Sequence, residues 1–506
     1  MKQNIKKISN KFINIIERGG NALPHPAALF GIFALLTLLL SAIGYFLNWQ
    51  GVNPANGENV KIINLISVEG LHRILLQLVD NYTGFAPLGI VMVAMLGIGV
   101  AESSGLIKAA INALIQRTPK YAITFMIVFT GVISNVASDL GYILIIPLSG
   151  VIFHTLGRNP IAGMSAAFAG VSGGFSANLL IGTIDPLLAG LSTEAARIID
   201  PDYYVMPTAN YYFMAVSTFL IAISGTWITH IWVEPRLGRY TGEVKIEPVQ
   251  KLKSSEKKGL RWVIVVILLW LTIFAFGLIP DNGFLRGKDN TVLHSPLIKG
   301  FIAVLFLMAS SCGIVFGYIS GNFKKHDDVI NGMSTSFKSL VSFLVLVFFA
   351  SQFVAWFKWS NLGLVLAIKG ADFLQAMNMH LIPLVILFII FSGFINLFMG
   401  SASAKWAIMG PVFIPMFMLL GYSPELSQAV FRIGDSVTNV ISPMMSFFAL
   451  IIVYYQKYDK NAGIGTLIGT MLPYSIIFFI AWSIMMIVWI LLGLPLGPEA
   501  GLFYTE

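Results

Sequence analysis

Charged residues and cysteine are both scarce in this sequence of 506 residues. Only 11% of the residues are charged and 56% are hydrophobic, whereas a soluble globular domain carries about 25% charged residues. This composition excludes a soluble globular protein and favours a single membrane domain that covers residues 1–506. The one cysteine, Cys312, can form neither an internal disulfide nor a thiolate metal cage.

The hydrophobic residues form long continuous runs. The first run, residues 27–47, exceeds the roughly 7 to 15 residues of a signal-peptide core, so we interpret it as a retained transmembrane helix. The further runs are also long enough to cross about 30 Å of hydrocarbon. The nine predicted transmembrane helices lie near residues 27–47, 84–102, 160–190, 208–233, 262–280, 296–320, 337–357, 422–455 and 466–492.

Two other apolar stretches are interrupted by short polar sequences. Residues 120–156 contain Ser-Asn-Val-Ala-Ser-Asp at 134–139, and residues 380–420 contain Gly-Ser-Ala-Ser-Ala-Lys at 400–405. Irregular backbone at membrane depth is tolerated only where protein or a water-filled cavity surrounds it. We therefore predict two re-entrant hairpins, in an all-α polytopic membrane protein with about nine transmembrane helices.

Positive charge is distributed unevenly along the chain, whose net charge is +8. Short membrane loops rich in lysine and arginine stay in the cytoplasm. With the N-terminus inside and the C-terminus outside, the inside segments hold 22 of the 32 lysines and arginines, the outside segments hold 8, and Lys405 and Arg432 remain in the membrane. The basic segment 234–261 is interpreted as a cytoplasmic loop, with a nucleic-acid-binding arm as the alternative.

An internal repeat links the two hairpins. The same order of four residues, proline, glycine, proline and glycine, recurs at identical spacing after an offset of 264 residues. The predicted topology places the first hairpin inside and the second outside. We therefore predict inverted repeats over residues 84–233 and 337–492, an architecture of secondary transporters. The repeated residues are Pro147, Gly157, Pro160 and Gly170 in the first copy, and Pro411, Gly421, Pro424 and Gly434 in the second.

Charged side chains at membrane depth are the strongest candidates for function, because a buried charge in lipid is costly. Asp185 ends a Gly- and Pro-containing stretch, 176–186, which we expect to be unwound and which includes Asn178. The alternative is that Asp185 lies at a helix end by the outer interface. Arg432 and Asp435 are three residues apart, so they share a helix face and can pair. In the functional interpretation Arg432 binds an anionic substrate group and Asp435 titrates or holds a cation.

Four residues of the second hairpin and the second broken span supply neutral oxygens that we expect near Asp435. Hard cations such as sodium bind side-chain oxygens and the carbonyls of unwound segments, so a sodium site is one interpretation. The alternative is that the small residues among them only allow helices to pack closely. The residues are Asn396, Ser401, Ser403 and Asn439.

Three further predictions concern the hairpin tips. Asn135, with Ser138 and Asp139, could form a second cation site in the first repeat. Trp406 could stack on an aromatic substrate or anchor the chain at the interface. Lys405 could simply reach the outer water.

Two absences narrow the mechanism. The chain has no Gly-x-x-x-x-Gly-Lys-Ser/Thr sequence, which excludes a nucleotide-driven motor of that kind and leaves ion-coupled or passive transport. It also offers no set of nucleophile, base and orienting group, so we predict that it is not an enzyme.

Long stretches of the sequence resemble one known family. The chain is similar to the p-aminobenzoyl-glutamate transporter (AbgT) family along almost its whole length. The residues that carry the resemblance are 17–26, 176–178 with Asp185 and Pro186, 400–406, and 432–436 with Asn439.

This resemblance implies a fold, a set of site residues and a function. It implies dimers of nine-span subunits with two re-entrant hairpins and a water-filled basin facing the cytoplasm. It also implies a sodium site formed by Asn396 and Asp435. Family members are described as exporters of sulfonamide antimetabolites driven by proton exchange, and as importers of p-aminobenzoyl-glutamate. The positions that it implies are important for transport are Asp185, Ser403, Trp406, Pro424, Arg432 and Asp435.

Together these observations predict an ion-coupled secondary transporter of small aromatic anions, either p-aminobenzoyl-glutamate or compounds of the p-aminobenzoate and sulfonamide kind. We expect proton-driven export, a homodimer, a bound sodium ion, and a bacterial inner or plasma membrane location. The alternative is a sodium-coupled dicarboxylate symporter of related architecture. An ion channel is a third class, but the sequence has no repeated carbonyl filter motif.

Overall fold

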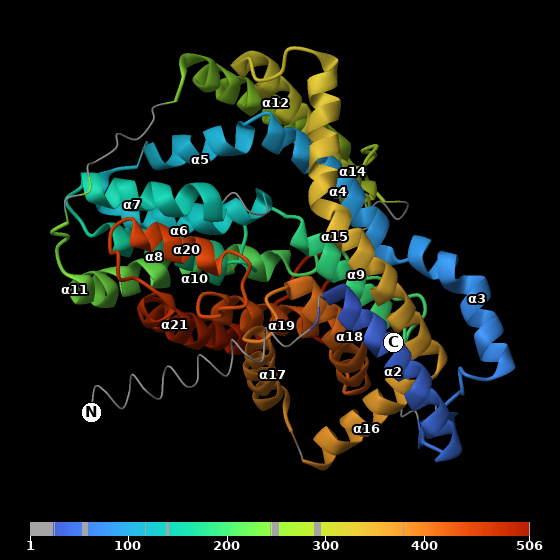
Figure 1. Ribbon diagram of the computed structural model, residues 1–506. Helices are drawn as coiled ribbons and strands as arrows, with labels where there is room; N and C mark the ends of the chain where they lie inside the picture. Colours follow the sequence, from blue (N-terminus) through green and yellow to red (C-terminus); the bar gives the residue numbers. More distant parts are fainter. Residues whose placement is uncertain are drawn as a thin grey trace, which may run out of the picture.

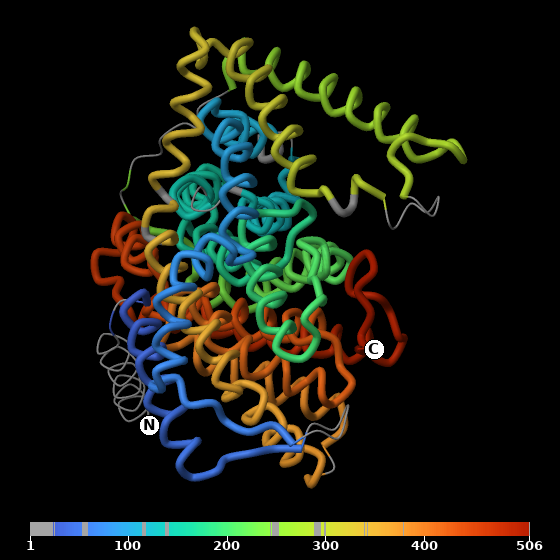
Figure 2. The backbone as a smooth tube through the Cα atoms, turned by 90° about the vertical axis from the view of Figure 1, so that its right-hand side faces the viewer, coloured from blue at the N-terminus to red at the C-terminus, as the bar shows by residue number. Residues whose placement is uncertain are grey.

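The computed structural model describes residues 24, 26–52, 59–116, 118–137, 141–242, 244, 252–287, 295–377 and 379–504 (Figure 1). These residues are almost entirely helical, which confirms the predicted all-α class. The strands found in them are β1 (Gln50–Val52) and β2 (Asn59–Lys61), which pair antiparallel with Gly51 opposite Val60. Figures 1 and 2 show the helices packed as one body.

One group of helices precedes and separates two hairpin-bearing halves. The helix α15 bends by 49° and packs on α2, α3 and α4, while α14 packs between α4 and α12. Figure 1 places α12 at the upper edge of the molecule, and the yellow-green tube of Figure 2 shows it there from the side. The bounds are α2 Pro26–Phe46, α3 Val68–Thr83, α4 Ala86–Ser103, α5 Leu106–Gln116, η1 Lys120–Ala122, α12 Ser254–Leu278, α13 Pro296–Lys299, α14 Phe301–Ser320, α15 His326–Trp359 and α16 Leu362–Ala376.

The two halves contain the same order of elements: a hairpin, a broken helix and a long helix. In the first half these are α6 and α7, then α8 and α9, then α10; in the second they are α17 and α18, then α19 and α20, then α21. The bounds are α6 Ile123–Ile133, η2 Ser134–Ala137, η3 Gly141–Ile145, α7 Ile146–Thr155, α8 Pro160–Phe168, η4 Ala169–Gly173, α9 Ile184–Ala196, α10 Tyr211–Ile228, η5 Thr229–Val233, α11 Glu234–Leu237, α17 Leu381–Asn396, α18 Ala402–Leu419, α19 Pro424–Asn439, α20 Phe448–Gln456 and α21 Ile464–Leu491.

The repeated glycines and prolines occupy equivalent places in the two halves. Gly157 and Gly421 have φ values of +71° and +83°, a left-handed conformation that ends the hairpin. Pro160 and Pro424 then begin the next helix, where proline has no backbone N–H to leave unpaired. The repeat found in the sequence is therefore repeated in the backbone.

The last glycine of each copy allows the hairpin to approach the broken helix. A Cβ at Gly170 would lie 2.2 Å from the Val128 carbonyl oxygen of α6, and a Cβ at Gly434 would lie 2.3 Å from the Ile389 carbonyl oxygen of α17. Only glycine fits such a contact between two backbones.

The nine predicted spans are found, although not all are continuous. Six of them are continuous apolar helices, a seventh is the bent α15, and the spans 160–190 and 422–455 are the broken helices of the two halves. Residues 174–183 and 440–447 form the breaks. Continuous α18 is itself long and apolar enough to cross a membrane.

Buried polar pairs join the two halves. The Tyr474 hydroxyl lies 2.6 Å from the Thr229 hydroxyl, and the Trp482 indole N–H donates to the Ser217 hydroxyl at 2.7 Å. Helix α10 packs on α21, and α9 packs on α18. Because the Tyr474 hydroxyl and the Trp482 indole N–H are both buried and both find a partner in the opposite half, these contacts favour a single arrangement of the two.

Some predicted features fall outside the described residues. They are Ser138 and Asp139 of the second cation site, most of the N-terminal motif 17–26, and residues 243 and 245–251 of the basic loop.

Candidate functional site

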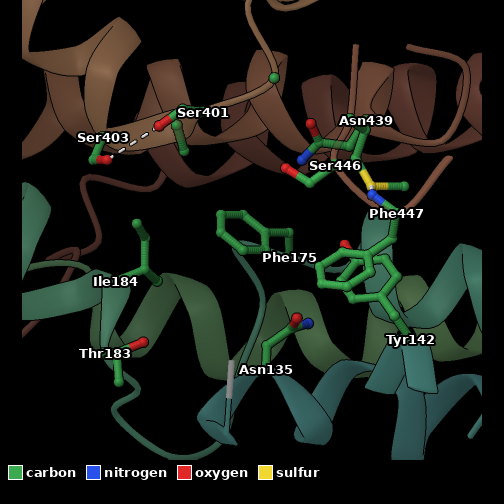
Figure 3. Close-up of a pocket in the computed structure, with 13 residues that line it drawn as sticks. Asn135, Tyr142, Phe175, Thr183, Ile184, Ser401, Ser403, Asn439, Ser446 and Phe447 are labelled. Carbon is green, nitrogen blue, oxygen red and sulfur yellow. Dashed lines mark hydrogen bonds between the residues drawn. The ribbon is translucent and has the colours of Figure 1, made fainter. Parts of the chain in front are cut away.

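A cavity of about 290 Å³ lies between the two halves (Figure 3). Each half contributes residues from its hairpin and from the break in its broken helix. The cavity is thus lined by the irregular segments at which a transporter of this type binds its substrate. The lining residues are Asn135, Tyr142, Phe175, Thr183 and Ile184 from the first half, and Gly400, Ser401, Ala402, Ser403, Asn439, Met445, Ser446 and Phe447 from the second.

The cavity wall combines aromatic rings with neutral polar groups. The rings of Tyr142 and Phe447, one from each half, stack with centroids 4.5 Å apart. The hydroxyls of Ser401 and Ser403 lie 3.3 Å apart on the opposite hairpin tip, as Figure 3 shows. Such a surface suits a flat aromatic molecule that carries polar groups.

Asp185 and Arg432 form a buried ion pair across the two halves. The Arg432 guanidinium donates to Asp185 Oδ1 at 2.6 Å, and the Gly182 backbone N–H donates to Asp185 Oδ2 at 2.7 Å. Asp185 lies in the first turn of α9, directly after Ile184 of the cavity wall, and is 1% exposed. Asp185 thus lies at a helix end, as the alternative interpretation expected, but it is buried and paired with Arg432.

The predicted pair between Arg432 and Asp435 is also wrong. Although both lie on α19, Arg432 contacts Asp185 of α9 instead, and Asp435 contacts Lys405 of α18. The helix spacing allowed a pair within α19, but each of the two residues instead pairs with an opposite charge from a neighbouring helix.

Lys405 does not reach the outer water, contrary to the prediction. Its side chain is fully buried, and its ammonium donates to Asp435 Oδ1 and Asn396 Oδ1. The Asn396 amide nitrogen in turn donates to the Asp435 carbonyl oxygen at 2.7 Å and to Asn439 Oδ1 at 2.8 Å. Two predicted sodium ligands are thus brought together around an ammonium group.

The first half has a related arrangement without charge. Asn135 lies in η2 after α6, three positions beyond Val132, which the offset of 264 aligns with Asn396; its amide nitrogen donates to the Val171 carbonyl oxygen at 3.0 Å. Val171 precedes Asp435 by the repeat offset of 264 residues. The repeat therefore gives the charged cluster only to the second half, while Asn135 lines the cavity.

Trp406 is not free to stack on a substrate in this structure. It is fully buried, its ring stacks on Phe431 with centroids 4.5 Å apart, and its indole N–H donates to the Ser192 hydroxyl at 2.8 Å. Trp406 thus packs one hairpin of the second half against α9 of the first. The substrate-stacking prediction is replaced by a packing contact between the halves.

A chain of hydrogen bonds that the sequence did not predict continues from Trp406. The Ser192 hydroxyl donates to Gln428, and the Gln428 amide donates to Asn210 at 2.9 Å. The side chain of Glu425 accepts a hydrogen bond from the Tyr203 hydroxyl at 2.9 Å. Burial and the neighbouring Glu425 both raise the pKa of Tyr203, so its hydroxyl keeps its proton and remains a donor. A polar stripe at helical spacing was the available signal: Glu425, Gln428, Arg432, Asp435 and Asn439.

The remaining predicted residues have distinct positions. Ser403 and Asn439 line the cavity, whereas Asn178 is buried in the first break, where its side chain accepts from the Leu180 N–H at 3.3 Å. Pro424 begins α19, behind the Ser423 cap. Their parts in transport stay predictions.

The oxygens of Asn396 and Asp435 are of the type that binds sodium, but they do not fit the ion in this arrangement. Both accept from the Lys405 ammonium, which fills the space between them. No step of the function proposed below therefore depends on sodium.

Comparison with known proteins identifies the family. A family model described as the AbgT putative transporter family matches residues 11–504. The chain belongs to this family. It is therefore a multi-pass membrane transport protein and not an enzyme.

Relatives and solved structures cover nearly the whole chain. The p-aminobenzoyl-glutamate transport protein of Escherichia coli (strain K12) is 38% identical over 491 residues, which are 97% of this chain and 96% of that protein. The crystal structure of the Alcanivorax borkumensis YdaH transporter, described as having an unusual topology, has a TM-score of 0.89 and 46% identity, and it covers 94% of this chain and 100% of that chain. The structure of Neisseria gonorrhoeae MtrF, described as illuminating a class of antimetabolite efflux pumps, has a TM-score of 0.91 and 48% identity. It covers 97% of this chain and 100% of that chain.

Proposed function

We propose that this protein is an ion-coupled secondary transporter of small aromatic anions, of the p-aminobenzoyl-glutamate or the p-aminobenzoate and sulfonamide type. The observation that carries the proposal is the cavity between the two hairpin tips, because both halves line it with aromatic rings and neutral polar groups. The name of the Escherichia coli relative, a p-aminobenzoyl-glutamate transport protein, supports the first of these substrates. The description of Neisseria gonorrhoeae MtrF as illuminating a class of antimetabolite efflux pumps supports export.

The Asp185–Arg432 pair is the proposed coupling element. In the structure the two charges neutralise each other at the boundary between the halves. A proton on Asp185 would remove its charge, so the Arg432 guanidinium would lose its partner and become available to the carboxylate or sulfonyl group of a substrate. Loss of the proton would restore the ion pair and displace the anion. Proton binding and anion binding are thereby linked, which is the basis of ion coupling.

The cavity position explains how access could alternate. Its wall consists of hairpin tips and helix breaks, which have few backbone hydrogen bonds to hold them in one conformation. Movement of one hairpin relative to the other half would open the cavity to one side of the membrane. The ion pair biases this movement because it bridges α9 of the first half and α19 of the second.

The decisive experiment is flux in proteoliposomes. Radiolabelled p-aminobenzoyl-glutamate and a radiolabelled sulfonamide are loaded with an imposed proton or sodium gradient, and Asp185→Asn and Asp435→Ala variants serve as controls. We expect saturable flux that follows the proton gradient and is lost in both variants while they remain folded. Normal flux in both variants would contradict the proposal. Sodium-driven uptake of a simple dicarboxylate, without transport of either aromatic solute, would indicate the symporter instead.

We also propose the cellular setting. The protein would be a homodimer in a bacterial inner or plasma membrane, with its N-terminus in the cytoplasm and its C-terminus outside, and export of sulfonamides would confer resistance to them. Expression in a sulfonamide-sensitive bacterium should raise the inhibitory concentration, and crosslinking in the membrane should trap a species of twice the mass.

A further inference from the structure

The cluster around Lys405 contains a cation that belongs to the protein. The Lys405 ammonium contacts one oxygen of Asp435 and the side-chain oxygen of Asn396, and these are the oxygens expected to bind sodium. We propose that Lys405 is the resident cation of this site, and that the wild-type protein binds no sodium there. This inference follows from the geometry of the cluster. Only its meaning for transport rests on the proposed function.

Charge balance in the cluster supports the proposal. Lys405 and Asp435 are 0% and 1% exposed and cancel each other. The other buried pair nearby, Asp185 and Arg432, is also neutral. A sodium ion added to the intact cluster would therefore leave an uncompensated positive charge in a buried region, which is costly. Sodium can be accommodated only if the Lys405 ammonium is absent.

The orientation of Asn396 is fixed by its surroundings. Its amide nitrogen, which carries two hydrogens, lies within hydrogen-bond distance of three acceptors: the Asp435 carbonyl oxygen, the Thr438 hydroxyl at 2.8 Å and Asn439 Oδ1. The opposite side of the amide, the Oδ1 atom, is thereby turned toward Lys405. The second half thus presents a preformed pair of oxygens, and the chain itself supplies the cation that these oxygens require.

The lysine also connects two parts of the transport machinery. Lys405 lies in the first turn of α18, at the hairpin tip, two residues after Ser403 of the cavity wall. Its contact with Asp435 holds this tip against α19. If a sodium ion held the hairpin tip against α19, the position of the tip would depend on sodium concentration. Because the ammonium is part of the chain, the position of the tip does not depend on it.

Sodium binding to purified protein, without substrate, tests this inference. Thermal unfolding is followed in NaCl and in KCl at equal ionic strength, and ²²Na⁺ binding is measured directly. We expect the wild type to show no sodium-specific rise in Tm and no bound ²²Na⁺. The Lys405→Ala and Lys405→Gln variants should both gain a saturable, sodium-specific rise in Tm with about one ion bound per chain, and adding Asp435→Asn should abolish it.

The controls separate this inference from the proposed function. Lys460→Ala removes the same charge at an exposed position and should gain no sodium response. Saturable sodium binding by the wild type that Asp435→Asn removes would overturn the inference, as would the absence of any gain in both Lys405 variants. Failure of substrate flux would contradict the proposed function and would leave these binding results unaffected.

Discussion

At the residue scale, four of the buried charged side chains in the described part of this transporter form two ion pairs, and each pair joins neighbouring helices. Asp185 and Arg432 connect the halves, while Lys405 and Asp435 connect a hairpin tip to α19. Buried pairs of this kind add little stability in comparison with apolar packing, but losing one partner leaves a charge without compensation. Their presence at the boundary of the two halves and at a hairpin tip is therefore better explained by function than by stability.

Removal of Arg432 should reveal the cost of a buried charge that has lost its partner. In Arg432→Gln the Asp185 carboxylate stays buried without its cation, so we expect a loss of about 3–5 kcal/mol in the free energy of unfolding. The double variant Asp185→Asn with Arg432→Gln should recover part of that loss, because neither charge remains. Chemical unfolding of the purified proteins in detergent measures both values. Losses that simply add in the double variant would show that the two side chains do not interact.

At the element scale, each hairpin is held against its broken helix by a glycine. Gly434 of α19 faces Ser392 and Ile389 of α17, and Gly170 of η4 faces Val128 of α6. Close backbone approach matters in a membrane protein because packing contributes more than burial from water does. The repeated glycine therefore determines how closely hairpin and broken helix pack in both halves.

Addition of a single methyl group should loosen this packing. The Cβ of Gly434→Ala would lie 1.8 Å from the Ser392 hydroxyl oxygen, so we expect a destabilisation of about 1–3 kcal/mol. The control is Gly465→Ala in α21, where nothing lies within 4 Å of the new Cβ and helix propensity favours alanine by up to about 1 kcal/mol. Equal Tm values for the two variants would argue against close packing at Gly434.

At the scale of the whole molecule, the cavity exists only because two halves of similar structure meet. Its walls come from residues 135–184 of one half and 400–447 of the other. Neither half encloses the cavity alone, and the pairs between Thr229 and Tyr474 and between Ser217 and Trp482 keep the halves together. Substrate binding and the contact between the halves are thus properties of the same surface.

Filling this cavity should stop transport without unfolding the protein. Ser403 lies on the hairpin tip and is only partly buried, so the indole of Ser403→Trp can enter the cavity of about 290 Å³ rather than a packed core. We expect flux to fall by at least about 10-fold with an unchanged elution profile in size-exclusion chromatography. Ser254→Trp, at the exposed start of α12, is the matched control and should transport normally. Undiminished flux in Ser403→Trp would place the substrate path elsewhere.

Much of this architecture could be predicted from residue order. The length of a hydrophobic run is a local property of the sequence, and a run of about 20 residues is long enough to span a bilayer. The spans and the two interrupted hairpins could therefore be identified from the sequence, and the structure confirmed them. The Pro and Gly pattern at an offset of 264 also predicted the repeat, because Pro160 and Pro424 begin helices and Gly157 and Gly421 end hairpins for local backbone reasons.

The sequence by itself determined that this is a helical membrane protein with two similar halves, and it singled out Asp185, Arg432 and Asp435 as charged residues within or beside its apolar segments. Only the tertiary structure decided which charges pair. Helix spacing brought Arg432 and Asp435 to one face, yet Arg432 binds a carboxylate 247 positions away because α9 of the first half packs on α19. The partner of a buried charge is the nearest opposite charge in space, and that distance depends on how helices pack, which local spacing does not contain.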